Sequence, residues 1–83
     1  MKIKLELFGA SRDFSNKDYL NLELQYKASI NDLRNEIIKY LYKNFQGNEN
    51  FIKIVKSSAF CSENNKIISD NYKITKDQKI GII

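Results

Sequence analysis

The sequence of 83 residues predicts an α+β domain in which one β-sheet packs against one main helix. Three observations support this prediction: two early segments with alternating apolar residues, one amphipathic helical segment, and short strand-like segments that end at Ile83. The resulting element order is β-β-α-β-β, and the length fits a single domain over residues 1–83. So small a domain has little room for a deep active site, and we therefore expect its function on the surface or at a terminus.

The first two strands are predicted at residues 2–8 and 20–26, because both segments show the period of two that half-buries a strand. The residues that share a face are Ile3, Leu5 and Leu7 in the first segment and Leu20, Leu22 and Leu24 in the second. Residues 9–19 between them are polar and turn-rich, which predicts a long hairpin loop.

The main helix is predicted to begin after Ser29, whose hydroxyl can cap it, with Asp32 completing a capping-box pattern. Its core face has the helical period and consists of Ile30, Leu33, Ile37, Leu41 and Phe45. Arg34 falls within this arc, so we expect its stem to cover the sheet edge and its guanidinium to reach water or a carboxylate. Gly47 predicts the C-cap, and residues 47–50 predict a loop.

The segments after this loop are shorter and more varied. Residues 51–55 are apolar apart from one lysine and fit either a strand or packed coil, whereas the small, uncharged residues 57–61 predict a central strand. Asn64-Asn65 indicates a turn before a short strand at residues 67–68. Residues 69–75 are irregular, with Tyr72 and Ile74 as inward anchors, and residues 79–83 predict the last strand.

The composition excludes most catalytic chemistry. The chain has no histidine, so the usual imidazole base and any Ser–His or Cys–His pair are missing. No spacing suits a metal site or a glycine-rich phosphate loop, and Glu63, Asp70 and Asp77 are scattered through turns. The lone Cys61 fits a small packed thiol at a strand end. We therefore expect no catalytic residue and no metal site.

The charge and the cysteine content indicate where such a protein works. A single cysteine allows no internal disulfide, and no long apolar run or signal segment is present, which predicts a cytoplasmic protein without a membrane partner. The net charge of +4 comes from lysines spread along the chain. Tyr40 and Tyr42, with Lys39 and Lys43, could form a nucleic-acid patch. However, the two tyrosines lie about 200° apart on the helix and form no single stacking platform, so we expect no nucleic-acid partner.

Four segments in order carry a family resemblance over essentially the whole chain. They are LFGASRDF at residues 7–14, SINDLR at 29–34, SSAFC at 57–61 leading into IISD at 67–70, and DNYKITKDQKIGII at 70–83. With this order and spacing the sequence resembles the ubiquitin-like sulfur carriers, and among them most the small subunit of molybdopterin synthase. The fold that this resemblance implies is the β-grasp.

The resemblance implies a protein cosubstrate that carries sulfur for molybdenum cofactor biosynthesis. In the family, a ubiquitin-activating-like adenylyltransferase uses ATP to adenylate the C-terminal carboxylate, which then becomes a thiocarboxylate. The large subunit of the synthase takes up the tail, supplies the catalytic side chains and transfers the sulfur to a pterin precursor to form the dithiolene. The small subunit itself binds no cofactor.

The sequence departs from the family pattern at its end. Family members continue past the last strand into a flexible tail ending in Gly-Gly, whereas this sequence stops at Ile83 on an apolar strand. We expect a Gly-Gly tail beyond residue 83, because an apolar strand is an unusual exposed terminus. The family's Asp-Gly turn before the last strand is replaced by Lys76-Asp77-Gln78-Lys79.

Two other functions remain open. One is a related carrier for another sulfur pathway such as thiamine synthesis, although the chain length and the long first loop favour the molybdopterin type. The other is a β-grasp protein-interaction module without chemistry, which would follow if Ile83 were the native end.

Matching the family's docking surface position by position implies three partner-binding residues, Arg12, Ile67 and Ile83. In the family these positions help to form a partly apolar patch that meets the activating enzyme and the large subunit. The alternative is structural: Ile67 and Ile83 would complete the buried face of the sheet, and Arg12 would be a loop charge.

Overall fold

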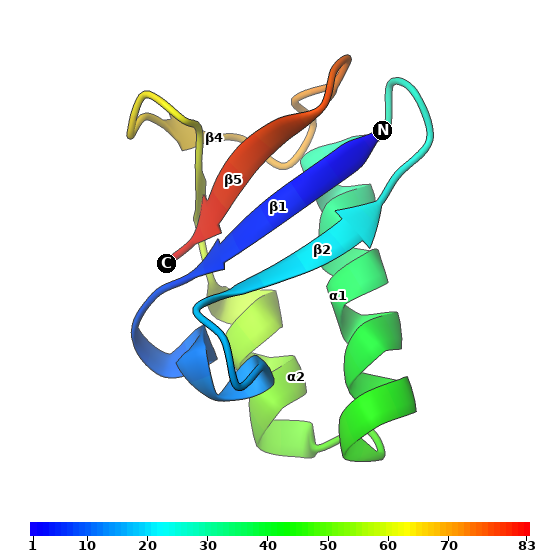
Figure 1. The fold of residues 1–83 in the computed structure, drawn as a ribbon, viewed down its shortest axis with the longest axis vertical. Helices are drawn as coiled ribbons and strands as arrows, with labels where there is room; N and C mark the ends of the chain where they lie inside the picture. Colours follow the sequence, from blue (N-terminus) through cyan, green and yellow to red (C-terminus); the bar gives the residue numbers. More distant parts are fainter.

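A five-stranded sheet forms one layer of the molecule and two helices form the other. The computed structural model describes all residues 1–83, and its elements run in the order shown in Figure 1. They are β1 (Lys2–Leu7), the 3₁₀-helix η1 (Gly9–Phe14), β2 (Tyr19–Glu23), α1 (Ile30–Phe45), α2 (Glu49–Ser57), β3 (Phe60–Cys61), β4 (Ile67–Ile68) and β5 (Gln78–Ile82). No helix is long and apolar enough to cross a membrane.

The sheet is mixed and has the strand order β2-β1-β5-β3-β4. Strands β1 and β5 are parallel neighbours at its centre, and the other neighbouring strands are antiparallel. The first and last strands of the chain thus lie side by side, as Figure 1 shows. The predicted α+β class, with one mixed sheet on one main helix, is confirmed.

The core lies between the sheet and α1. The residues predicted to share the inner face of the first strand are fully buried, as is the helix stripe except for Phe45, which packs at its margin. The central buried side chains are Ile3, Leu5, Leu7, Ile30, Leu33, Ile37, Leu41, Ile80 and Ile82. Both periodicities read from the sequence therefore identify the core correctly, because burial of apolar area is the main driving force of folding.

The capping of α1 follows the prediction at its start and differs by one residue at its end. Ser29 Oγ accepts a hydrogen bond from the Asp32 amide at 3.0 Å, and Asp32 Oδ2 accepts one from the Ser29 amide at 2.8 Å. At the other end Gln46, not Gly47, is the C-cap, with a left-handed φ of 55°. Gly47 follows with a φ of 70°, which glycine adopts without strain.

The largest correction concerns residues 48–57. Neither a strand nor packed coil forms at residues 51–55; they belong to α2, which begins where a loop was predicted. Asn48 Oδ1 accepts a hydrogen bond from the Phe51 amide at 3.1 Å and so caps this helix. The predicted strand at residues 57–61 shrinks to β3, because Ser57 still belongs to α2.

Two loop predictions also change. The long loop after β1 contains η1, which buries Phe14. Of the two inward anchors predicted in the segment before β5, Ile74 is buried, but Tyr72 is 43% exposed. The backbones of both residues bond to the segment that leads into α1: Ile74 exchanges hydrogen bonds with Ala28 and Lys27, and the Tyr72 carbonyl accepts one from the Ile30 amide. The pairing therefore holds both residues in place, but only the Ile74 side chain lies in the core.

Candidate docking surface

The face of the sheet opposite α1 carries an apolar surface near the carboxyl end of β5. Because Ile80 and Ile82 point into the core, Gly81 between them lies on the outer face of the sheet, where neighbouring side chains bury it. Its register partners are Glu6 on β1 and Cys61 on β3, and Cys61 is paired in turn with Ile67 on β4. The sheet therefore places Gly81, Cys61 and Ile67 in one row across three strands.

Phe8 adds an aromatic ring to this row. Phe8 follows the last residue of β1, and its Cε2 atom lies 3.0 Å from the position that a Cβ atom on Gly81 would occupy. Cys61 Sγ lies 2.8 Å from the same position. The missing side chain of Gly81 is thus what allows Phe8 and Cys61 to approach each other over β5.

We define the apolar patch as Phe8, Cys61, Ile67, Gly81 and Ile83. Phe8, Ile67 and Ile83 are 46%, 64% and 50% exposed, respectively. Ile83 is held at the end of the sheet by two backbone hydrogen bonds with Ala59, of 2.9 and 3.0 Å. Exposed large apolar side chains that gather on one face are typical of an interaction surface.

The structure places the three predicted partner-binding residues differently. Ile67 and Ile83 belong to the apolar patch, and their exposure excludes the alternative that they complete the buried face of the sheet. Arg12 is an exposed residue of η1, and no hydrogen bond or ion pair joins it to another side chain. Its segment is nevertheless tied to the patch, because Ser11 Oγ accepts a hydrogen bond from the Phe8 amide at 3.1 Å and donates one to the Phe8 carbonyl.

Phe8, Cys61 and Gly81 were not predicted as site residues. A signal for Phe8 exists in the sequence, because alternation from Ile3 to Leu7 puts position 8 on the outer face, where a phenylalanine is unusual. The contact of Gly81 with Cys61 depends on the pairing of β5 with β3, which the sequence pattern does not reveal.

The remaining surface offers no comparable chemistry. No group of three or more His, Cys, Asp or Glu side chains is placed to hold a metal ion. Burial raises the pKa of Tyr40, whose hydroxyl donates to the Phe14 carbonyl at 2.6 Å, so this phenol serves packing. A groove between the end of β2 and the first half of α1 lies away from the apolar patch, and its lining residues are mostly polar.

Comparisons with known proteins agree with this architecture. No protein-family model matches the chain, and no curated protein matches it. Among solved structures it is similar to one described as a candidate molybdopterin converting factor, subunit 1, from Pyrococcus furiosus. The two share 18% sequence identity with a TM-score of 0.67, over 98% of this chain and 93% of the other. The chain therefore has the β-grasp fold.

Proposed function

We propose that this protein is the sulfur-carrier small subunit of a molybdopterin synthase, acting in the cytoplasm. The observation that carries the proposal is the match, over nearly the full length of both chains, to a structure described as a molybdopterin converting factor subunit. An apolar patch beside the end of β5 supports it, because a tail leaving Ile83 would start within a surface suited to a protein partner.

The proposed chemistry takes place on a C-terminal carboxylate. A carboxylate oxygen attacks the α-phosphorus of ATP on a ubiquitin-activating-like adenylyltransferase, which releases pyrophosphate and leaves an acyl adenylate. A sulfide-level sulfur nucleophile then displaces AMP and leaves a thiocarboxylate. The large subunit of the synthase would use this sulfur to build the dithiolene of the molybdenum cofactor, while the present chain supplies no catalytic side chain.

This chemistry requires residues beyond Ile83 that end in Gly-Gly. Glycines without side chains allow an extended tail to enter a narrow channel in the partner. The apolar patch would stay outside that channel and hold the carrier in place, with Arg12 at its margin. Phe8, Ile67 and Ile83 would be the anchors, because large apolar side chains dominate interface energetics.

The C-terminal peptide of the protein from its native source tests the proposal. We expect mass spectrometry to show a tail ending in Gly-Gly, part of it with sulfur in place of one terminal oxygen. A native chain that ends at Ile83 would contradict the proposal and leave a β-grasp interaction module. A Gly-Gly tail without affinity for the large synthase subunit would assign the carrier to another sulfur pathway, such as thiamine synthesis.

The docking surface is tested separately with matched aromatic substitutions. Phe8→Ser removes a half-exposed ring from the apolar patch, whereas Tyr26→Ser removes an exposed ring, 65% accessible, from the turn before α1. Calorimetric titration with the large subunit should show at least about tenfold weaker binding for Phe8→Ser and no change for Tyr26→Ser. Equal affinities of the two variants would exclude docking through the patch.

A further inference from the structure

Strand β2 lies at an open edge of the sheet and has unpaired backbone groups. The residues that flank β2 are hydrogen-bonded to the first strand: the Leu7 amide donates to the Asp18 carbonyl, and the Leu24 amide and carbonyl both bond to Met1. By alternation along the register, Leu20 and Leu22 also direct their backbone groups toward β1. In an antiparallel pair the intervening residues point the other way. The amides and carbonyls of Tyr19, Asn21 and Glu23 therefore face outward, with no strand beside them.

This edge lacks the usual protection against pairing. Sheet edges are normally blunted by proline, by a bulge, by lysines on the strand or by a very short strand. Strand β2 is five residues long, has a regular register with β1, contains neither proline nor lysine, and has a single charged residue, Glu23, at its end. The opposite edge strand, β4, has only two residues, so β2 is the edge available for pairing.

We propose that two copies of this chain associate through β2, antiparallel about a two-fold axis at Asn21. This arrangement pairs Tyr19 with Glu23 of the second copy and Asn21 with its own counterpart. Each outward amide then meets an outward carbonyl, and the two five-stranded sheets become one continuous sheet.

The side chains on both faces fit this pairing. On the helix side Leu20 lies opposite Leu22 of the second copy, which covers Leu22, the one leucine of the strand that is only partly buried. On the outer side Glu23 of the second copy reaches Tyr19. Two ammonium groups lie there, since Lys4 Nζ is 4.5 Å and Lys17 Nζ 5.6 Å from the Tyr19 ring centroid.

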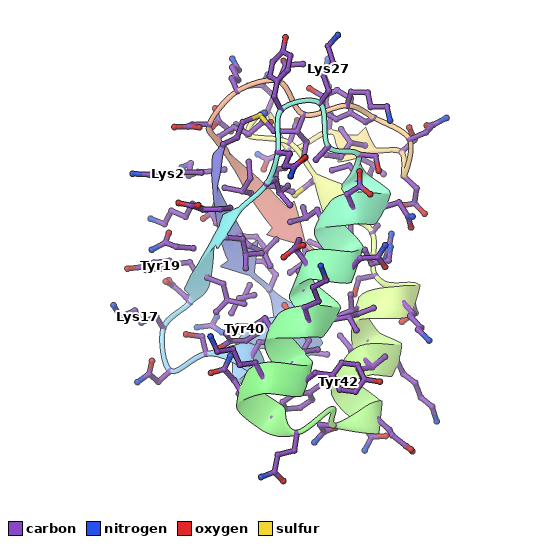
Figure 2. The ribbon with its side chains drawn as sticks, turned by 90° about the vertical axis from the view of Figure 1, so that its right-hand side faces the viewer. Lys2, Lys17, Tyr19, Lys27, Tyr40 and Tyr42 are labelled. Carbon is purple, nitrogen blue, oxygen red and sulfur yellow. The ribbon has the colours of Figure 1, made fainter.

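The charged groups at this edge form no ion pair within one chain. The ion pairs of the protein are Arg34–Asp70 and Lys39–Glu36, so Lys4, Lys17 and Glu23 take part in none. Figure 2 views the molecule from the side of β2 and α1 and shows Lys17 and Tyr19 at the start of the strand. In the proposed dimer, the Glu23 carboxylate of each copy lies beside Lys4 and Lys17 of the other copy. The two-fold axis produces this contact twice, once at each end of the paired strands.

The association is weak and does not depend on the proposed function. A pair of five-residue strands buries less area than the ~1,200 Å² of a standard stable interface, so a dissociation constant of about 0.1–1 mM is expected. The apolar patch lies over β5, β3 and β4, toward the other edge of the sheet. It stays accessible in the dimer, so the sulfur-carrier proposal neither requires this association nor fails with it.

Substitutions at Asn21 test the backbone pairing. The Asn21 amide faces the open edge, so Asn21→Pro, present in both copies, removes the two mutual Asn21 bonds of the interface without removing one to β1. Asn21→Ala keeps the amide and is the matched control. In sedimentation equilibrium up to about 1 mM protein, we expect Asn21→Pro to raise the dimer dissociation constant about tenfold and Asn21→Ala to leave it unchanged. A monomeric wild type, or a dissociation constant that Asn21→Pro leaves unchanged, would overturn the proposal.

A charge exchange gives a second test that keeps every backbone group. Lys17 and Glu23 are six residues apart, or about 20 Å along an extended strand, so they meet only across the interface. Lys17→Glu and Glu23→Lys should each weaken the dimer about threefold, and the double variant should recover wild-type affinity. Additive losses in the double variant would exclude the proposed two-fold register. Circular dichroism of each variant verifies that it is folded.

Discussion

At the scale of single residues, Gly81 decides the shape of the apolar patch. A methyl group at this position would approach Cys61 Sγ to 2.8 Å and the Phe8 ring to 3.0 Å. Both neighbours are side chains and can shift, so the contact displaces them but does not break the strand. The glycine is needed here for space on the sheet surface, and not for its backbone freedom.

The substitution Gly81→Ala should therefore destabilise the protein by about 1 kcal/mol through overpacking. It should also weaken binding to the proposed partner, the large synthase subunit, because the Phe8 ring moves. Adding Cys61→Ala removes the closest contact, so the double variant should regain most of the lost stability in urea unfolding. A loss that Cys61→Ala does not relieve would place the strain elsewhere.

A second residue-scale prediction concerns acid stability at the start of α1. Hydrogen bonds from the backbone and side chain of Ser29 hold the pKa of Asp32 below its ordinary value of 3.8. A depressed pKa in the folded state means that Asp32 contributes stability above the pKa of the unfolded chain. That contribution is lost as the pH falls below about 4 and passes through the folded pKa.

Thermal unfolding of the wild type and of Asp32→Asn between neutral pH and about pH 2 measures this effect. The melting temperatures of the two proteins should differ at neutral pH and converge in acid. Parallel curves over the whole range would show that the capping carboxylate does not titrate with folding.

At the scale of elements, Arg34 joins α1 to the segments that follow α2. Its guanidinium donates to the Val55 carbonyl, to the Ser58 carbonyl at 2.9 Å and to Asp70 Oδ1 at 2.7 Å. Its Cζ atom also lies 4.8 Å from the centroid of the Phe60 ring. This one side chain satisfies the carbonyls at the end of α2 and holds the start of β3 against α1.

Removing this group should cost more than removing its acidic partner. Arg34→Met removes the guanidinium donor from the Ser58 carbonyl and from the Val55 carbonyl, which keeps only the long 3.4 Å bond from the Ser58 amide. It should lower the free energy of unfolding by about 2–4 kcal/mol. Asp70→Asn should cost less than about 1 kcal/mol, because the Asp70 side chain is 64% exposed and its ion pair is screened. Urea titration of both variants compares them, and similar losses would show that the ion pair, not the carbonyl contacts, holds this junction.

The element α2 also shows where local patterns fail. Residues 51–55 are mostly apolar, and a run of this length fits a strand as well as a helix. The structure chooses the helix because Asn48 caps it and because Phe51 packs against Phe14 and Phe45, with ring centroids 5.1 and 5.2 Å apart. Asn48 is a helix-capping residue and was the one signal for this helix in the sequence. The aromatic partners of Phe51 belong to η1 and α1, so a local pattern could not reveal them.

At the scale of the whole molecule, the fold separates the buried core from the candidate docking surface. The core lies between the sheet and α1, whereas the apolar patch lies on the opposite face. Ile67→Asp changes a side chain that is 64% exposed, so the free energy of unfolding should change by no more than about 0.5 kcal/mol. Binding to the proposed partner, the large synthase subunit, should nevertheless weaken at least about tenfold.

Arg12→Glu tests whether docking extends beyond the apolar patch. Arg12 is exposed on η1 and forms no ion pair with an acidic side chain of its own chain. The substitution should weaken partner binding without unfolding the domain. Unchanged affinity by calorimetry, beside a clear loss for Ile67→Asp, would confine docking to the apolar patch.

The sequence by itself determined the α+β class, the inner face of β1, the stripe of α1 and the capping box of Ser29 and Asp32. These features depend on residues close together in the chain, whose period and capping chemistry act locally. The same local patterns predicted the short strand at residues 67–68 and the last strand, which the structure places at Ile67–Ile68 and Gln78–Ile82.

Only the tertiary structure decided the helical state of α2, the exposure of Tyr72, Ile67 and Ile83, and the gathering of Phe8, Cys61 and Gly81. Each of these depends on which strands and helices become neighbours. That choice is made by burying the whole core at once, since β5 pairs with β1 from the other end of the chain and with β3 on its far side. A local pattern can assign a residue to a face of its strand, but contacts between distant segments determine whether that face is buried or free to bind.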